Sequence, residues 1–207
     1  MTADLTFYTN AMSRGRIAHW MLEEVGAPYR TVYVQYGPEM KSPGYLAINP
    51  MGKVPSLRHG DSVVTECGAI CAYLADSFPE AELAPPPGAR GAYYRWMFFA
   101  AGPVEAATTN KALGVEVPPD RSRFVGYGSL ALVVDTLEAA LATGPYLCGD
   151  QFTAADVYAG SQMAFGLQFG TLESRPALVD YTARITARPA HGRAKALDDA
   201  AMPAGGG

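Results

Sequence analysis

Cysteine and histidine are scarce in this chain. Its 207 residues include only three of each. The cysteines are Cys67, Cys71 and Cys148, and an odd, sparse set of this kind is typical of reduced thiols rather than of a disulfide framework. A metal site needs several such ligands at close spacing, and the histidines lie far from the cysteines in sequence. We therefore expect free thiols and no metal.

Long apolar runs and clustered charges are also missing. No apolar run reaches the roughly 18 residues that a membrane span requires, and no basic stretch followed by an apolar one opens the chain. We therefore expect no membrane association, no secretory signal and a cytoplasmic protein. Charged residues make up 17% of the chain and the net charge is −4. This balance argues against nucleic acid as a partner, because phosphate binding needs clustered Lys and Arg.

Apolar residues are plentiful, at 49% of the chain, and a chain of this size can bury about 70% of its surface. The first 78 residues alternate between strand and helix patterns. Residues 5–8 and 29–34 have β-type composition, and the segment 13–25 between them repeats apolar residues at helical spacing, with Arg16, His19 and Glu23 on another face. A helical crossover between two strands predicts a parallel pair.

A second strand pair is expected further along this half. Residues 54–57 and 62–65 read as strands joined by a hairpin turn, and 66–78 reads as a helix. The segment 35–52 is rich in proline and glycine and is expected to be a loop.

The second half of the chain is helical in pattern. Residues 79–88 contain four prolines and mark a linker. We therefore divide the chain into a domain over 1–78, the linker, and an all-helical domain over 89–207 with a disordered C-terminal tail. Gly102-Pro103 predicts a kink in the first long helix, and a helix at 154–169, apolar nearly all round, is expected to be the buried one.

Four local features carry chemistry or capping. Ser13 stands where a strand meets a helix: it is either an N-cap or a donor to an incoming thiolate, aided by the helix dipole and by Arg14 and Arg16. Val54-Pro55 is either an ordinary trans edge proline or a cis bond that presents the main chain of Val54 to an extended peptide.

The third feature is Glu66-Cys67, which either merely begins a helix or offers two N–H groups to a carboxylate and a carboxylate to an ammonium group. The fourth, Thr153 to Asp156, predicts a structural capping box.

In combination, these stretches resemble the cytosolic glutathione transferases over nearly the full chain. The segments that carry the resemblance are 13–16 with 20–29, 49–57, 65–70 with Tyr73-Leu74, 149–156, and Arg188-Pro189-Ala190. The resemblance implies an α/β thioredoxin-like N-terminal domain and an all-α C-terminal domain. It also implies glutathione as co-substrate on the first domain, an electrophile in the cleft between the two, and a homodimer.

The same resemblance implies roles for single residues. Val54 would pair with the cysteinyl backbone of glutathione, with Pro55 cis. Glu66 and Cys67 would hold the γ-glutamyl end, and Lys41 and Lys53 would lie near the glycine carboxylate. Ser13 would activate the thiol, as in the serine-type classes. For the hydrophobic electrophile we expect the side chains of Met12, Trp96, Phe99 and Phe165 to form an apolar pocket.

Two departures from the family pattern stand out. Family members usually have serine where this chain has Cys67, and a thiol is the weaker donor, so weaker glutathione binding is expected. The tyrosine of the tyrosine-type classes falls on Asn10, which is the alternative activating residue, ahead of Tyr8 and Thr9. The cysteine of the thiol-transferring classes falls near Ala11, which disfavours chemistry on a protein cysteine there.

These observations predict a glutathione transferase that ionises the bound thiol and conjugates it to a hydrophobic electrophile. The alternative is a transferase-like protein that binds glutathione or apolar ligands without turnover. A third, minor possibility is glutathione-dependent isomerisation or reduction.

Overall fold

The computed structural model describes residues 4–202 of the chain. They form two compact units: one runs to Glu82 and resumes at Ala187, and the other spans Leu83–Thr186. The proposed boundary at 79–88 comes near the first crossing between them. The last helix, which the sequence places with the helical half, packs in the first unit. The tail expected to be disordered, residues 204–207, lies outside the described residues.

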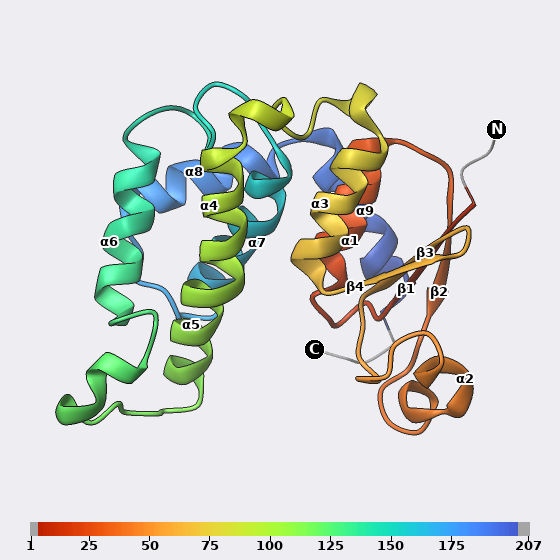
Figure 1. The fold of residues 1–207 in the computed structure, drawn as a ribbon, viewed down its shortest axis with the longest axis horizontal. Coiled ribbons are helices and arrows are strands. Elements are labelled where there is room, and N and C mark those ends of the chain that lie inside the picture. Colours follow the sequence, from red (N-terminus) through yellow and green to blue (C-terminus); the bar gives the residue numbers. More distant parts are fainter. Residues whose placement is uncertain (1–3, 203–207) are drawn as a thin grey trace. The chain divides into compact units, whose positions relative to one another are not determined.

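A four-stranded mixed sheet forms the centre of the first unit (Figure 1). Its strands in spatial order are β2 (Tyr29–Tyr33), β1 (Leu5–Thr9), β3 (Ser56–His59) and β4 (Ser62–Thr65). β1 pairs parallel to β2 and antiparallel to β3, and β3 and β4 form a hairpin. The parallel crossover and the hairpin predicted from the sequence are thus confirmed, in the arrangement of a thioredoxin-like domain.

Three helices pack together in this unit (Figure 1): α1 (Gly15–Val25), α3 (Cys67–Ser77) and α9 (Pro189–Ala200), with α1 contacting both of the others. Side chains of β1 alternate between the two faces of the sheet. Phe7 lies against His19 of α1, with ring centroids 5.3 Å apart. Tyr8 lies against Tyr45, with centroids 6.0 Å apart, so each face of the sheet is covered.

The segment expected to be a loop contains two short helices. A 3-10 turn spans Glu39–Lys41 and α2 spans Pro43–Leu46. Ser42 caps α2, because its Oγ accepts a hydrogen bond from the N–H of Tyr45, and Pro43 occupies the first helical position. The expectation of a loop was wrong here. It rested on the many prolines and glycines of the segment and did not take into account that Ser42-Pro43 is a typical helix start.

Helix α9 covers a histidine that the sequence places on a polar face. The ring of His19 is 1% exposed; its Nδ1 lies 2.8 Å from Asp198 Oδ1 and its Nε2 lies 2.9 Å from the hydroxyl of Tyr29. Tyr29 donates onward to Glu23 at 2.6 Å. The sequence pattern shows only that His19 lies off the apolar stripe, and its burial depends on Asp198, which is 179 positions away in the chain.

The second unit is helical. Its first helix is interrupted where a kink was predicted: a π-helical segment with Pro103 inside it separates two α-helical stretches. Helix α7 is the buried one, as predicted, with most of its side chains inaccessible. The helical segments are α4 (Gly91–Phe99), the π segment (Ala100–Val104), α5 (Glu105–Ala112), α6 (Leu130–Leu141), α7 (Ala154–Gln168) and α8 (Pro176–Thr186).

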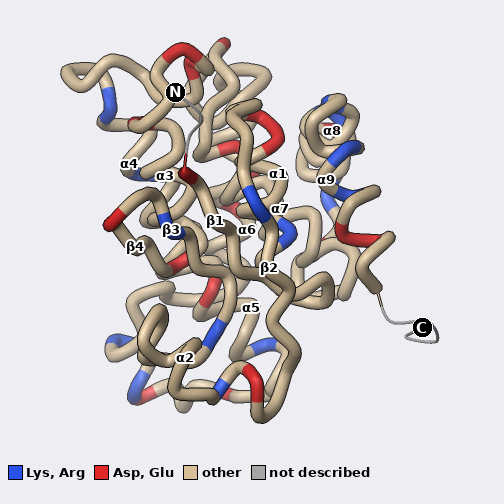
Figure 2. The backbone as a smooth tube through the Cα atoms, turned by 90° about the vertical axis from the view of Figure 1, so that its right-hand side faces the viewer, with Lys and Arg blue, Asp and Glu red and all other residues tan. Residues whose placement is uncertain are grey.

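Charges of both signs are dispersed along the backbone (Figure 2). Within residues 4–202, no helix is both long and apolar enough to cross a membrane.

Candidate functional site

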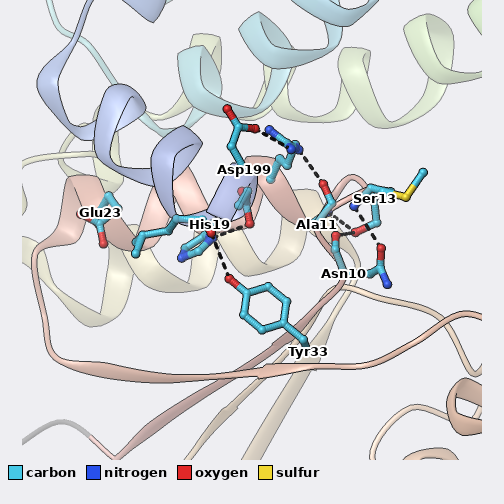
Figure 3. Close-up of polar contacts among 12 residues, drawn as sticks. Asn10, Ala11, Ser13, His19, Glu23, Tyr33 and Asp199 are labelled. Atoms are coloured by element: carbon cyan, nitrogen blue, oxygen red, sulfur yellow. Dashed lines mark hydrogen bonds and ion pairs between the residues drawn. The ribbon is translucent and has the colours of Figure 1, made fainter. Parts of the chain in front are cut away.

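The loop between β1 and α1 is held by Asn10 (Figure 3). This residue is 7% exposed. Its Nδ2 donates to the carbonyl of Val34 at 3.0 Å, and its Oδ1 accepts from the N–H of Met12 at 3.0 Å. Both ends of the amide are therefore engaged in tying the loop to the chain after β2. This arrangement makes Asn10 a residue that shapes the loop.

Ser13 lies at the end of the same loop and is partly exposed (Figure 3). Its hydroxyl donates to the carbonyl of Asn10 at 2.7 Å, while its Oγ accepts from the N–H of Gly15 at 2.9 Å. The expected N-cap role of Ser13 is wrong in detail: Arg14 takes the N-cap position and makes no side-chain cap, and Ser13, one residue earlier, holds the N–H of the first helical residue instead. Because a hydroxyl hydrogen can rotate, the same group can turn from the Asn10 carbonyl to a ligand atom.

Gly15 begins α1 where no larger residue fits. A Cβ at this position would lie 2.0 Å from Thr9 Oγ1 and 2.9 Å from Ser13 Oγ. Thr9 is fully buried, and its Oγ1 has no hydrogen-bond partner among the described residues. The close approach of β1 to α1 therefore sets the position of Ser13.

The start of α3 lies beside the start of α1. The thiol of Cys67 donates to the carbonyl of Arg14, at an S–O distance of 3.6 Å. Glu66, just before the helix, is exposed and has φ +68° and ψ 122°, a conformation rarely adopted by a non-glycine residue. The first N–H groups of α3 have no partner inside the helix and carry the positive end of its dipole. Two of the predicted site segments, Ser13-Arg14 and Glu66-Cys67, thus meet at one place.

The turn before β3 contains the other predicted glutathione contacts. The Val54–Pro55 peptide bond is cis, as the resemblance implies, and Val54 lies just outside the paired residues of β3. The ammonium group of Lys41 donates to the carbonyls of Met51 and Gly52, at 2.9 and 2.8 Å. Lys41 therefore holds this turn, whereas the side chain of Lys53 is exposed.

Two side chains donate hydrogen bonds to the carbonyl of Lys53. It accepts from the hydroxyl of Tyr45 at 2.7 Å and from Nδ2 of Asn49 at 2.8 Å. Burial raises the pKa of Tyr45, so this hydroxyl stays protonated and keeps donating at neutral pH. The result is a rigid turn with a cationic side chain on its surface.

The residues proposed for the electrophile fall in both units. Met12 is 57% exposed in the first unit. In the second, Trp96 is only 5% exposed and packs edge-on against Phe99, with ring centroids 5.6 Å apart. Phe165 is partly buried and lies 6.4 Å from Phe169 by ring centroids. Trp96 therefore serves mainly the helical core, and Phe99 and Phe165 keep some exposed surface.

Two site-shaping contacts have no signal in the local sequence, and Figure 3 shows Ala11 and Asp199, which take part in the first of them. The guanidinium of Arg16 donates to the carbonyl of Ala11 at 2.6 Å and to Asp199 of α9 at 2.9 Å. The sequence pattern assigned Arg16 to the thiolate, but its side chain instead ties the loop to the C-terminal helix. The hydroxyl of Tyr36 lies 3.5 Å from the carbonyl of Met12.

Within the described residues, no group of three or more His, Cys, Asp and Glu side chains is placed to hold a metal ion. The polar groups at the site are instead suited to a charged, extended organic ligand: two helix starts, a carboxylate and a lysine. The sheet and the helices together define a thioredoxin-like domain followed by an all-helical domain.

Comparison with known proteins identifies the family. The model of the glutathione S-transferase N-terminal domain matches residues 11–77, and the model of the C-terminal domain matches residues 128–189. Glutathione S-transferase F10 of Arabidopsis thaliana is 32% identical over 165 residues, which cover 74% of this chain and 76% of that protein. The chain belongs to the glutathione S-transferase family.

Solved structures agree with this assignment. A glutathione transferase from Methylococcus capsulatus superposes with a TM-score of 0.79 at 28% identity, covering 95% of this chain and 99% of that one. A glutathione transferase homologue from Sulfitobacter, solved with bound glutathione, superposes with a TM-score of 0.75 at 27% identity, covering 98% and 100%.

Proposed function

We propose that this glutathione transferase binds glutathione on its first unit, ionises the bound thiol and adds it to a hydrophobic electrophile. The observation that carries the proposal is the meeting of the α1 and α3 starts, where the Cys67 thiol reaches the Arg14 carbonyl. The glutathione bound to the Sulfitobacter homologue supports the choice of ligand.

Each charged group of glutathione would have a polar partner in the proposed site. The γ-glutamyl carboxylate would accept from the main-chain N–H groups at the start of α3, and its ammonium group would donate to Glu66. The cysteinyl main chain would pair with Val54, next to the cis Pro55. The glycine carboxylate would lie near Lys53 and near Lys41.

In the proposed mechanism, Ser13 and the start of α1 stabilise the thiolate. A free thiol has a pKa of about 8.5, and making it tenfold more acidic requires about 1.4 kcal/mol of preference for the ionised form. A charge-assisted hydrogen bond from Ser13 together with the α1 dipole is of this size. Asn10, whose amide is already engaged, would hold the loop in place. For the electrophile we keep Met12, Phe99 and Phe165 as the proposed contacts, and Trp96 packs against Phe99.

The test is a spectroscopic titration of the glutathione complex. A thiolate absorbs in the ultraviolet, so the absorbance of the complex against pH gives the pKa of the bound thiol. We expect the bound thiol to be roughly tenfold more acidic than that of free glutathione, or more, together with conjugation of an activated aryl halide such as chlorodinitrobenzene. A bound thiol that titrates like the free one, with no turnover on several electrophiles, would establish the non-catalytic binding protein instead.

We further propose a homodimeric, cytoplasmic enzyme, as is typical of the family. Sedimentation at micromolar concentration is expected to give twice the 22.0 kDa chain mass, and a single species at the chain mass would contradict the dimer.

A further inference from the structure

Two cysteines of α3 lie one helical turn apart. Cys67 is the first residue of the helix and is partly exposed, while Cys71, one turn further on, is fully buried. The thiol of Cys67 donates to the carbonyl of Arg14, and the Cys71 side chain lies behind it on the same face of the helix, four positions along the chain. The pair therefore runs from the core to the surface of the proposed glutathione site.

The two cysteines differ in what can reach them. The hydrogen bond to Cys67, followed by burial, raises the pKa of Cys71 well above its usual value. Cys71 is thus held as a neutral thiol behind its partner, whereas solvent reaches Cys67. The third cysteine, Cys148, lies in the other unit and accepts from Thr153 Oγ1 at 3.6 Å. Among the described residues, Cys148 has no thiol neighbour, so it is a natural internal control.

The helix geometry allows a disulfide between Cys67 and Cys71, but only under strain. Residues four apart in an α-helix have Cα atoms about 6 Å apart, which lies inside the range of roughly 4.4–6.8 Å found for disulfides. Their Cβ atoms, about 5–6 Å apart, must approach to about 4 Å. Closing that gap distorts the first turn of α3, and a strained disulfide is easily reduced.

We propose that Cys67 and Cys71 are a reversible thiol–disulfide pair that reacts with small disulfides such as glutathione disulfide. The thiolate of Cys67 attacks one sulfur of the disulfide, whose S–S bond breaks and releases one glutathione thiolate, which takes up the proton lost by Cys67. Cys71 then ionises, its thiolate attacks the sulfur of Cys67, and the second glutathione leaves as a thiolate that takes up the proton lost by Cys71. Two protein thiols and one glutathione disulfide become one protein disulfide and two glutathione molecules.

Oxidation of the pair weakens glutathione binding at the same place. The disulfide pulls Cys67 toward the core and moves the N–H groups at the start of α3, directly after the unusual backbone of Glu66. This consequence rests on the proposed function, because it assumes that those N–H groups bind glutathione. We expect the affinity for S-methylglutathione, which cannot exchange thiols, to fall roughly tenfold, the effect of losing one hydrogen bond to a charged group.

The test measures the oxidation state of each cysteine by mass spectrometry. The full chain is incubated with glutathione disulfide, quenched with acid, alkylated and analysed by peptide mass spectrometry. The wild type is expected to form the Cys67–Cys71 disulfide, with only a transient glutathionyl adduct. Cys71→Ala is expected to accumulate a stable adduct on Cys67, and Cys148→Ser is expected to behave like the wild type. A Cys67 that stays reduced, or a stable adduct on it in the wild type, would overturn the proposal.

A second disulfide separates this proposal from the proposed function. Bis(hydroxyethyl) disulfide shares no recognition groups with glutathione, so it is expected to oxidise the pair even if the chain binds no glutathione. If the disulfide forms but the reduced protein does not bind S-methylglutathione, the proposed function fails and the thiol pair stands. If the reduced protein binds S-methylglutathione and neither disulfide oxidises the pair, the thiol pair fails alone.

Discussion

The first N–H groups of a helix have no partner inside the helix. The start of α7 is closed by buried side chains, whereas the neighbouring starts of α1 and α3 are open to solvent. At α7, Thr153 and Asp156 are both fully buried. The carboxylate of Asp156 accepts from the N–H groups of Leu147 and Thr153 and from the hydroxyl of Tyr181, at 2.8–2.9 Å. At α1 and α3, Ser13 and Cys67 are partly exposed and their donors are bound only to nearby carbonyls.

This difference separates a helix start that stabilises the fold from one that is available to a ligand. A closed network loses stability when it is changed, whereas an open one has donors that can be redirected at little cost. We therefore expect substitutions at α7 to affect unfolding and substitutions at α1 and α3 to affect binding and rate. Matched substitutions at the two kinds of start test that division.

The largest effect is expected for Asp156→Ala. The substitution leaves buried donors of Leu147, Thr153 and Tyr181 without an acceptor, and each such group costs about 1–3 kcal/mol. We expect the free energy of unfolding to fall by about 4 kcal/mol, measured by urea denaturation. The matched control is Asp150→Ala, an exposed aspartate in the preceding turn, with an expected change within about 0.5 kcal/mol. Equal effects of the two substitutions would mean that α7 is not closed by this carboxylate.

The next effect is expected for Gly15→Ala. The new methyl group would meet Thr9 Oγ1, and such overpacking costs about 2 kcal/mol. Gly91→Ala is the control, because a Cβ there contacts nothing within 4 Å. Adding Thr9→Ala to Gly15→Ala should recover part of the loss in a double-mutant cycle. Additive losses would show that β1 and α1 do not crowd each other at this point.

The buried start of α7 could be predicted from the sequence, and the exposed starts of α1 and α3 only in part. Thr153 and Asp156 are three positions apart, so their spacing alone indicates a capping box. Ser13 and Glu66 are also recognisable one at a time, but nothing local shows that their segments meet. The salt bridge between Arg16 and Asp199 joins residues 183 positions apart, and the burial of His19 likewise depends on the last helix. Such contacts come from tertiary packing, which a periodic pattern does not encode.

A smaller effect, on rate rather than stability, is expected for Ser13→Ala. If Ser13 donates to the thiolate, kcat for conjugation should fall at least tenfold while glutathione affinity changes little. Ser129→Ala is the matched control, because Ser129 caps α6 by accepting from the N–H of Leu132 at 3.1 Å. Ser129→Ala should lose about 1 kcal/mol of stability as a lost cap, and Ser13→Ala about as much, because its Oγ accepts from the N–H of Gly15. Wild-type turnover by Ser13→Ala would mean that Ser13 only shapes the loop before α1, and Asn10 would be the next residue to test.

The smallest effect concerns the pH dependence of the closed start. Burial raises the pKa of Asp156 above its ordinary value of 3.8, although its hydrogen bonds oppose the rise. A raised pKa in the folded state means that the folded protein binds the proton more tightly than the unfolded chain does. The contribution of this group to stability is therefore complete below pH 3.8 and is lost as the pH rises through the raised pKa.

Comparison with Asp156→Asn, which cannot titrate, isolates this contribution. Urea unfolding of both proteins between neutral pH and about pH 4 should show the difference in free energy moving in favour of the wild type as the pH falls. The slope approaches about 1.4 kcal/mol per pH unit between the unfolded and folded pKa values of the carboxyl group. A difference that moves in the opposite direction would mean that the hydrogen bonds from Leu147, Thr153 and Tyr181 outweigh burial. The start of α7 would then favour the ionised carboxylate, as an anion-binding helix start does, and the contrast with α1 and α3 would lie in exposure alone.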